Sequence, residues 1–198
     1  MRILIACEHS GTVRDAFLKK GHDAWSCDLL PTDVPGPHIQ GDVLEILNDG
    51  WDMMIAHPEC TYLANSGVQW LNKDPSRWSK MVKAGEFFKT LQTADIEKKV
   101  IENPIMHGYG KEAAGCGQQT QLIQPYHFGT PESKATCLWV EGLDKLEHTN
   151  NVKHIYDKLP KREQQKMFYL PPSPDRWKLR SKTYQCFADA FAEQWGRK

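Results

Sequence analysis

The chain has 198 residues and carries 25 Lys and Arg against 25 Asp and Glu, so its formal net charge at pH 7 is zero. This balance excludes a protein that attracts nucleic acid through an overall positive field, and it leaves local basic patches for such contacts. No apolar run reaches the roughly 18 residues of a membrane-spanning helix, and MRILIAC is too short for a signal peptide. We therefore expect a cytoplasmic protein with no membrane partner.

The length favours one domain, residues 1–198. The six cysteines form no C-x-x-C pair, which favours a reduced protein without disulfides. Residues that could bind zinc are scattered without the spacing of a zinc site, namely His57, Cys60, His107, Cys116 and His127. No metal is therefore expected.

The first part of the chain alternates short apolar runs with helical patterns. Strands are predicted at residues 2–7, 22–28, 51–57 and 98–104, and helices at 12–21 and 74–92. Residues 29–38 read as a proline-rich loop, and residues 41–47 as a short element opened by Asp42. The inward face of the helix at 74–92 is predicted to hold Trp78, Met81, Val82, Gly85, Phe88 and Leu91.

Further strands are predicted at residues 121–125 and 135–140, and a terminal helix at 183–196. The polar, proline-rich residues 142–175 are expected to form an insertion or flap. Strands that alternate with helices predict an α/β fold, in which a mostly parallel sheet carries helices on both faces. Ligands bind such sheets at the carboxyl ends of the strands. Five polar tips should meet there: Glu8–Gly11, Asp28, Asp42, His57–Cys60 and Glu102–Pro104.

Three of these tips suit a nucleotide-like ligand. Gly11 precedes a helix and would let a ligand approach the backbone, although an ordinary tight turn explains it equally well. Asp28 ends the second strand, where a carboxylate can accept hydrogen bonds from ribose hydroxyls or remain a solvated strand-end acid. Asp42 could accept from an exocyclic amine or cap the residues that follow it.

The fourth and fifth tips could carry covalent chemistry. Cys60 follows His-Pro-Glu just beyond a buried strand, which suits a nucleophile as well as it suits a packed thiol. Glu102 ends the next strand and would lie beside Cys60 if the two strands are neighbours. A glutamate there could protonate a pyrimidine ring, or it could be a surface residue at a strand end.

The chain resembles the cytosine-5 DNA methyltransferase family in a series of motifs that occur in the same order. These are ACEHSGT, Asp28, GDV, WDMMIAHPEC and VIENP. The phrases HPECTYLANSG and SPDRWKLRSKTY are most similar to its compact, phage-type members. The resemblance implies a Rossmann-like methyltransferase fold and, for a phage protein, the cytoplasm of a bacterial host.

The resemblance also implies a mechanism. Cys60 would attack carbon 6 of a cytosine flipped out of DNA, while Glu102 protonates the ring. S-adenosylmethionine would be bound by Cys7, Glu8, His9, Ser10, Gly11, Asp28, Asp42, His57 and Pro58. The substrate would be bound by Asn103, Lys134, Arg176, Lys178 and Arg180.

The sequence departs from the family pattern at several places. Glu59 replaces the second proline of the nucleophile loop, Pro104 replaces a valine, and Lys134 stands near the position of the late paired arginines. Only the insertion at 142–171 is available in place of a target-recognition domain. These departures keep two alternatives open: the same chemistry on RNA or a free cytosine nucleotide, and a non-catalytic regulator or decoy that binds cofactor or nucleic acid.

Overall fold

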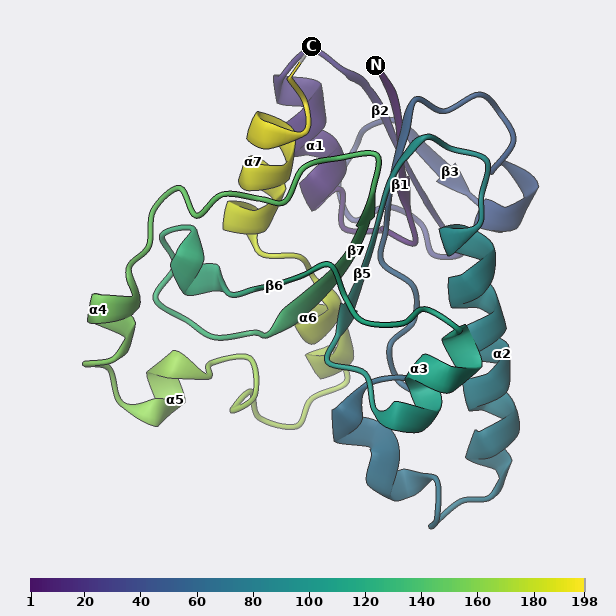
Figure 1. Ribbon diagram of the computed structural model, residues 1–198. Helices are drawn as coiled ribbons and strands as arrows, with labels where there is room; N and C mark the ends of the chain where they lie inside the picture. Colours follow the sequence, from purple (N-terminus) through teal and green to yellow (C-terminus); the bar gives the residue numbers. More distant parts are fainter. Residues whose placement is uncertain (198) are drawn as a thin grey trace.

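The computed structural model describes residues 1–197, and its centre is one seven-stranded sheet (Figure 1). The strand order is β3-β2-β1-β4-β5-β7-β6. The strands are β1 (Arg2–Ala6), β2 (Asp23–Asp28), β3 (His38–Gln40), β4 (Met53–Ala56), β5 (Lys98–Pro104), β6 (Gln121–Ile123) and β7 (Thr136–Glu141).

The first five strands are parallel, and β7 pairs antiparallel with both β5 and β6. The fully buried runs of β1 and β4 are typical of a parallel sheet covered on both faces. A mostly parallel sheet with β7 reversed between β5 and β6 is the Rossmann-like methyltransferase fold that the sequence predicts.

Helices cover both faces of the sheet, also as predicted. On one face, α1 (Thr12–Lys19) packs against α7 (Gln185–Gln194), and on the other α2 (Ser76–Gln92) packs against α3 (Gly108–Ala114) (Figure 1). Alternate residues of each strand enter the two cores. Val100 of β5, for example, belongs to the core with α7, whereas Ile101 belongs to the core with α2.

Two local predictions are wrong. Residues 29–38 were expected to be loop throughout, but β3 begins at His38, whose Nδ1 lies 2.9 Å from Ser26 Oγ on the neighbouring strand. A three-residue edge strand is too short to show a periodic pattern. Val82 was placed on the inward face of α2, yet it is 46% exposed. The short element after Gly41 is a 3₁₀ helix, Val43–Glu45, capped by Asp42.

Residues 142–171 are tied to the body of the protein at their beginning. Leu146 is buried in the core with α7, and the N–H groups of Asn150 and Val152 donate to the carbonyl oxygens of His127 and Tyr126. The helices α4 (Lys153–Tyr156) and α5 (Lys161–Gln164) lie on the β6 side of the molecule (Figure 1). The short helix α6 (Arg176–Ser181) then leads towards α7.

No helix within residues 1–197 has both the length and the apolar character to cross a lipid bilayer.

Candidate functional site at the carboxyl edge of the sheet

The parallel strands β1, β2, β4 and β5 end side by side, at what we call the carboxyl edge. Ala6 lies opposite Cys27 and Ala56, and Ala56 lies opposite Ile101. The next residue of each strand or loop therefore starts this edge, and these residues are Cys7, Asp28, His57 and Glu102. The convergence of polar tips that the sequence predicts is present.

The loop that carries Cys60 is held by its own turn and by the segment that follows β5. The carbonyl oxygen of Cys60 accepts from the N–H groups of Leu63 at 3.1 Å and Ala64 at 2.9 Å. Ala64 also forms a β-bridge with Met106. The thiol is thus carried on a loop whose position is fixed relative to the strand of Glu102.

His107 is a second brace of this loop, and sequence reasoning missed it. Its Nδ1 accepts from the N–H of Gly110 at 2.9 Å, so its Nε2 carries the proton and donates to the carbonyl oxygen of Tyr62 at 2.9 Å. The imidazole is 4% exposed. It therefore caps α3 and anchors the Cys60 loop at once, across 45 residues of sequence.

The residues just before Cys60 differ in their surroundings. Pro58 is buried, Glu59 is exposed, and Cys60 is half-buried. The predicted role of Pro58 at the cofactor has no polar side-chain atom to support it. Because Glu59 is solvated, its charge is the smallest of the influences on the pKa of the Cys60 thiol.

Glu102 and His57 are direct partners. Nδ1 of His57 lies 3.3 Å from Oε2 of Glu102, and the two side chains are 10% and 18% exposed. Burial pushes the pKa of Glu102 upward, but the hydrogen bond to His57 and the charges of His57 and Lys134 outweigh it, so the pKa lies below its usual range. The structure thus places His57, predicted as a cofactor residue, against the predicted acid.

The pKa of the Cys60 thiol is raised, first by burial and then by the negative charge of Glu102. The positive charge of Lys134 opposes both effects without cancelling them. Cys60, Glu102 and Lys134 are therefore close enough to influence each other's protonation. At neutral pH this arrangement holds a thiol beside an ionised carboxylate.

Lys134 precedes β7 and has backbone partners. Its Nζ donates to the carbonyl oxygens of Arg180 at 2.9 Å and Lys182 at 3.1 Å, at the end of α6. Burial lowers the pKa of its ammonium group, although Glu102 and Cys60 act in the opposite direction. Lys134 thus connects the start of β7, which pairs with β5, to the end of α6, and its ammonium group is occupied by these backbone acceptors.

Asn103 lies on the face of the sheet opposite to Glu102, because successive residues of a strand alternate. It is fully buried, its Nδ2 donates to the carbonyl oxygen of Pro104, and its Oδ1 has no hydrogen-bond partner within residues 1–197. This placement does not support the prediction that Asn103 binds the same substrate as Glu102.

The turn after β1 is used by the protein itself. The carboxylate of Glu8 accepts from the N–H groups of Val13 at 2.8 Å and Arg14 at 3.2 Å, and from Oγ of Ser10 at 3.1 Å. A carboxylate at a helix N-terminus is stabilising because it pairs with free N–H groups and the helix dipole. Glu8 and Ser10, predicted as cofactor ligands, therefore cap α1.

Gly11 makes room for protein atoms on the side where a side chain would stand. It has a φ of 70°, and a Cβ added to it would lie 2.5 Å from Nη2 of Arg14 and 2.7 Å from Cγ2 of Val34. The left-handed conformation and the close packing both require glycine. The contacts of this structure therefore explain Gly11 by packing within the protein, and its predicted role at a ligand stays a prediction.

Arg14 fills that space and was not singled out from the sequence. Its side chain is completely buried although it carries a charge. It donates to Asp15 Oδ1 (2.8 Å), Ser26 Oγ (3.3 Å), Thr32 Oγ1 (3.2 Å) and the carbonyl oxygens of Val34 and Pro35 (3.3 Å each). Arg14 thereby folds the loop at 29–37 back over the start of α1.

Asp28 and Asp42 retain acceptor atoms at the carboxyl edge. Oδ1 of Asp28 accepts a hydrogen bond from the N–H of Leu30, and Oδ1 of Asp42 accepts one from the N–H of Leu44. The second carboxylate oxygen, Oδ2, makes no hydrogen bond within residues 1–197 in either aspartate. Burial raises the pKa of Cys7, and the charges of both aspartates raise it further, so the two carboxylates converge on this residue. Cys7 itself has a φ of 58°.

The chemistry of these carboxylates suits part of S-adenosylmethionine. The ribose hydroxyls and the adenine amino group are donors, and carboxylate oxygens accept from such groups. Oδ2 of Asp42 has no hydrogen bond within residues 1–197, and Oδ2 of Asp28 lies 3.8 Å from Nδ1 of His9. Asp28 and Asp42 are therefore the residues whose acceptors would hold the nucleoside part of this cofactor.

The helix α6 reaches over this aspartate side of the edge. The imidazole of His9 lies between Asp28 and Asp33, at 3.8 Å and 3.9 Å. Its ring centre is 6.2 Å from that of Trp177, and Nζ of Lys178 lies 2.5 Å from Oδ1 of Asp33. α6 is thus joined to the cofactor side through Trp177 and Lys178.

The three basic residues predicted to bind substrate have different surroundings. Arg176 donates to the carbonyl oxygens of Leu170 and Phe168, and Lys178 is paired with Asp33. Arg180 is exposed, and its guanidinium has no hydrogen bond or ion pair within residues 1–197. Arg180 is therefore the one of the three whose charge is free for a phosphate.

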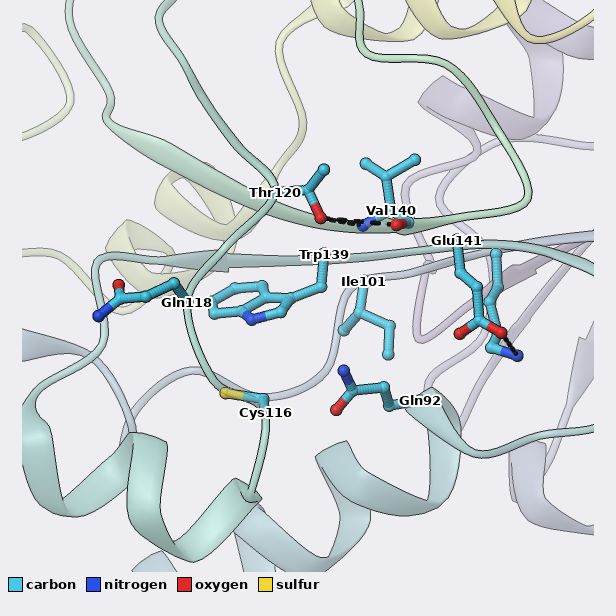
Figure 2. A pocket seen from close by; sticks show the side chains of 9 residues that line it. Gln92, Ile101, Cys116, Gln118, Thr120, Trp139, Val140 and Glu141 are labelled. Atoms are coloured by element: carbon cyan, nitrogen blue, oxygen red, sulfur yellow. Dashed lines mark hydrogen bonds and ion pairs between the residues drawn. The ribbon is translucent and has the colours of Figure 1, made fainter.

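A cavity of about 140 Å³ lies elsewhere, between β5, β7, the end of α2 and the segment that follows α3 (Figure 2). Ile101 and Trp139 line it and belong to the core with α2, whereas Glu102 pairs with Leu138 of the opposite core. Figure 2 shows Cys116 and Gln92 beneath Ile101 and the Trp139 ring. This cavity is separated from Glu102 by the sheet and is not part of the candidate site.

No three His, Cys, Asp or Glu side chains come together as possible metal ligands anywhere in residues 1–197.

Comparison with family models and with curated proteins finds no match. Among solved structures, the chain is similar to a prophage-encoded Escherichia coli protein described as a candidate DNA modification methyltransferase, with 16% identity and a TM-score of 0.47. It is also similar to the methyltransferase EhMeth of Entamoeba histolytica, with 12% identity and a TM-score of 0.49. These matches cover 72% and 76% of this chain but 48% and 56% of the other two, so the chain spans about half their length. Arguments about activity therefore rest on the site itself.

Proposed function

We propose that the protein transfers a methyl group from S-adenosylmethionine to carbon 5 of cytosine in DNA. The observation that carries this proposal is the meeting of Cys60, Glu102 and Lys134 at the carboxyl edge. A nucleophile and an acid on neighbouring strands are the two groups that activation of a pyrimidine requires.

In this proposal Cys60 and Glu102 have complementary roles. The thiol proton of Cys60 passes to water as the sulfur bonds to carbon 6 of the ring, and Glu102 delivers a proton to ring nitrogen 3, so that carbon 5 becomes nucleophilic and takes the methyl group. Carbon 5 then gives its proton to water, the carbon–sulfur bond breaks, and nitrogen 3 returns its proton to Glu102. The released sulfur takes a proton from water, so Cys60 and Glu102 regain their starting states.

The cofactor would be held on the other side of the edge. Asp28 and Asp42 would accept hydrogen bonds from its ribose and adenine groups, beside Cys7. When bound, S-adenosylmethionine supplies an electrophilic methyl group. His9 is placed by Asp28 and Asp33 to cover the same region, whereas Glu8 and Ser10 would contribute only by fixing the start of α1.

DNA would be contacted by residues 158–182, where eight Lys and Arg stand against two acidic residues, Glu163 and Asp175. Three aromatic side chains of this segment are exposed: Phe168 by 64%, Tyr169 by 43% and Trp177 by 57%. Basic residues interleaved with exposed aromatic rings suit phosphates and unpaired bases. Lys134 connects this segment to the catalytic residues.

A second candidate is a non-catalytic regulator or decoy with the same fold. The observation that favours it is the raised pKa of Cys60, which disfavours the thiolate. It would bind cofactor or nucleic acid at the same edge without forming a covalent bond. RNA or a free cytosine nucleotide remains the alternative substrate for the catalytic proposal, because residues 142–171 are short for a sequence-reading domain.

The decisive experiment is transfer of labelled methyl from S-adenosylmethionine to mixed-sequence DNA, with RNA and dCTP as parallel substrates. We expect label at carbon 5 of cytosine in DNA and none with Cys60→Ala. Cys116→Ala is the matched control, because Cys116 lines the cavity that the sheet separates from Glu102. Cofactor binding without transfer to any substrate would reject the enzyme and favour the binding protein.

A further inference from the structure

His57 occupies a position defined by two neighbouring strands. It follows β4, Glu102 lies within β5, and these residues come directly after the paired Ala56 and Ile101. The N–H of His57 donates to the carbonyl oxygen of Ala6, which fixes its backbone on the other side as well. The imidazole is therefore directed to Glu102 by the sheet register itself.

The imidazole is almost enclosed. It is 10% exposed, Nδ1 is 3.3 Å from Oε2 of Glu102, and Nε2 is buried with no hydrogen-bond partner within residues 1–197. A buried polar nitrogen without a partner costs free energy, so a purely structural residue would be expected to satisfy both nitrogens. Within residues 1–197, the single hydrogen-bond partner of the imidazole is Glu102, the proposed acid.

Three titratable groups act on the Glu102 side of this pair: Lys134, Cys60 and Cys137 interact electrostatically with the carboxylate. Glu59 is exposed and influences Cys60 only weakly. Glu102 itself is the group in direct contact with the imidazole.

The proposed reaction requires a group beside Glu102 that can supply it with a proton. The pKa of Glu102 is held below its usual range, so at neutral pH the carboxyl group is ionised and carries no proton to give. Protonation of ring nitrogen 3 therefore requires a proton source next to Glu102. An imidazole is the side chain that can store and return a proton near neutral pH.

We propose that His57 is a positioning residue that orients Glu102 and supplies it with the proton for ring nitrogen 3. The proposal rests on the methyltransferase function proposed above and adds a residue to it. An N–H bond of the His57 imidazolium breaks as an O–H bond forms on Glu102. That O–H bond then breaks as an N–H bond forms on the ring.

The step conserves charge and atoms. The imidazole becomes neutral, Glu102 is again a carboxylate, and the ring carries the proton. When the bond between sulfur and carbon 6 breaks, the proton returns to Glu102 and then to His57. No oxidant or further reactant is needed, and His57 contacts neither the substrate nor the cofactor.

The test uses His57→Asn, whose amide can still donate a hydrogen bond to Glu102 but cannot store a proton. We expect the rate of methyl transfer at neutral pH to fall about 100-fold, the lower range for general acid catalysis. The pH profile of the rate should differ between the wild type and His57→Asn, because only the wild type has an imidazole 3.3 Å from Glu102. His154→Asn, on the exposed helix α4, is the matched control.

Two further measurements separate this role from a structural one. His57→Asn should slow the reaction no further when Glu102→Gln is already present, because both act on the same proton. Independently of activity, the pKa of Glu102 followed by carbon NMR should rise in His57→Asn, since the imidazole lowers it.

The inference is overturned if His57→Asn keeps the wild-type rate and pH profile, or if the pKa of Glu102 does not change. Loss of folding in His57→Asn would be seen by circular dichroism, in which case His57→Gln replaces it in the same comparisons. A wild-type protein that transfers no methyl group defeats the proposed function, and this inference with it. An active wild type that depends on Cys60 but not on His57 defeats the inference alone.

Discussion

The ammonium group of Lys134 donates to the carbonyl oxygen of Arg180 at 2.9 Å, and the same charge lowers the pKa of Cys60. One side chain therefore both attaches α6 to the strand region and favours the thiolate. A substitution of Lys134 should therefore change the attachment of α6 and the pKa of Cys60 together.

Lys134→Met should raise the pKa of Cys60 further, because the one nearby positive charge that opposes burial and Glu102 is removed. Less thiolate then exists at a given pH, so alkylation of Cys60 by iodoacetamide should slow, by up to about tenfold for each pKa unit. Lys158→Met, at an exposed position, should leave the rate unchanged. Equal rates for Lys134→Met and wild type would contradict the assignment.

Glu102→Gln should change the same thiol in the opposite direction. The carboxylate raises the pKa of Cys60, so its removal should lower that pKa and speed alkylation between neutral pH and the ordinary thiol pKa. Methyl transfer should nevertheless fall by about 10²- to 10⁴-fold and leave a measurable residual rate, because the proposed proton donor is gone. A variant that alkylates more slowly than wild type would show that Glu102 does not act on Cys60. Glu112→Gln, on the exposed side of α3, is the control.

Arg14→Met should destabilise the protein by roughly 3 kcal/mol, because it leaves the partners of a buried charge unpaired. The loss should appear as a lower midpoint in urea unfolding followed by circular dichroism. Arg162→Met, on the exposed helix α5, should shift the midpoint by little. A similar midpoint for both variants would mean that Arg14 does not hold the loop at 29–37.

Gly11→Ala should cost more stability than Gly50→Ala, although both glycines have a φ above 65°. At Gly50 a Cβ meets no atom within 4 Å, so only the backbone penalty of about 1 kcal/mol applies. At Gly11 the added methyl also collides with Arg14 and Val34. The difference between the two unfolding free energies measures this collision, and a zero difference would exclude it.

Arg180→Gln should weaken DNA binding and reduce the slope of log K against log salt by about one, as expected for one phosphate contact. Arg176→Gln should act mainly on folding, because its guanidinium is bound to the carbonyl oxygens of Phe168 and Leu170. Fluorescence anisotropy with a labelled duplex at several salt concentrations distinguishes the two. An unchanged salt slope for Arg180→Gln would remove it from the interface.

The sequence predicts the parallel strands well, because buried runs such as that of β4 leave little choice of structure. It also places Cys60 and Glu102 at one edge, since this follows from strand direction alone. It does not predict contacts between distant side chains. His107 bracing the Cys60 loop and Lys134 holding α6 both depend on pairs about 45 residues apart. Neither pair produces a local pattern.

Contacts between distant residues also explain why predicted cofactor residues have structural contacts instead. From the sequence, Glu8 and Gly11 suit either a ligand or the start of a helix. The buried side chain of Arg14 supplies the packing that explains Gly11. An arginine in an amphipathic pattern normally lies at the surface. Its complete burial depends on acceptors in the loop at 29–37, which the pattern at residues 12–21 does not contain.

The buried guanidinium of Arg14 has a consequence for how this sequence can diverge. A Cβ at Gly36 would lie 2.6 Å from Arg14, and one at Gly11 would lie 2.5 Å from it, so a single side chain opposes a Cβ at two places 25 positions apart. A shorter residue at position 14 removes both contacts, but Val34 and the φ of 70° still oppose a side chain at Gly11. Among natural relatives, a residue other than glycine at position 36 should therefore occur only where Arg14 has also been replaced.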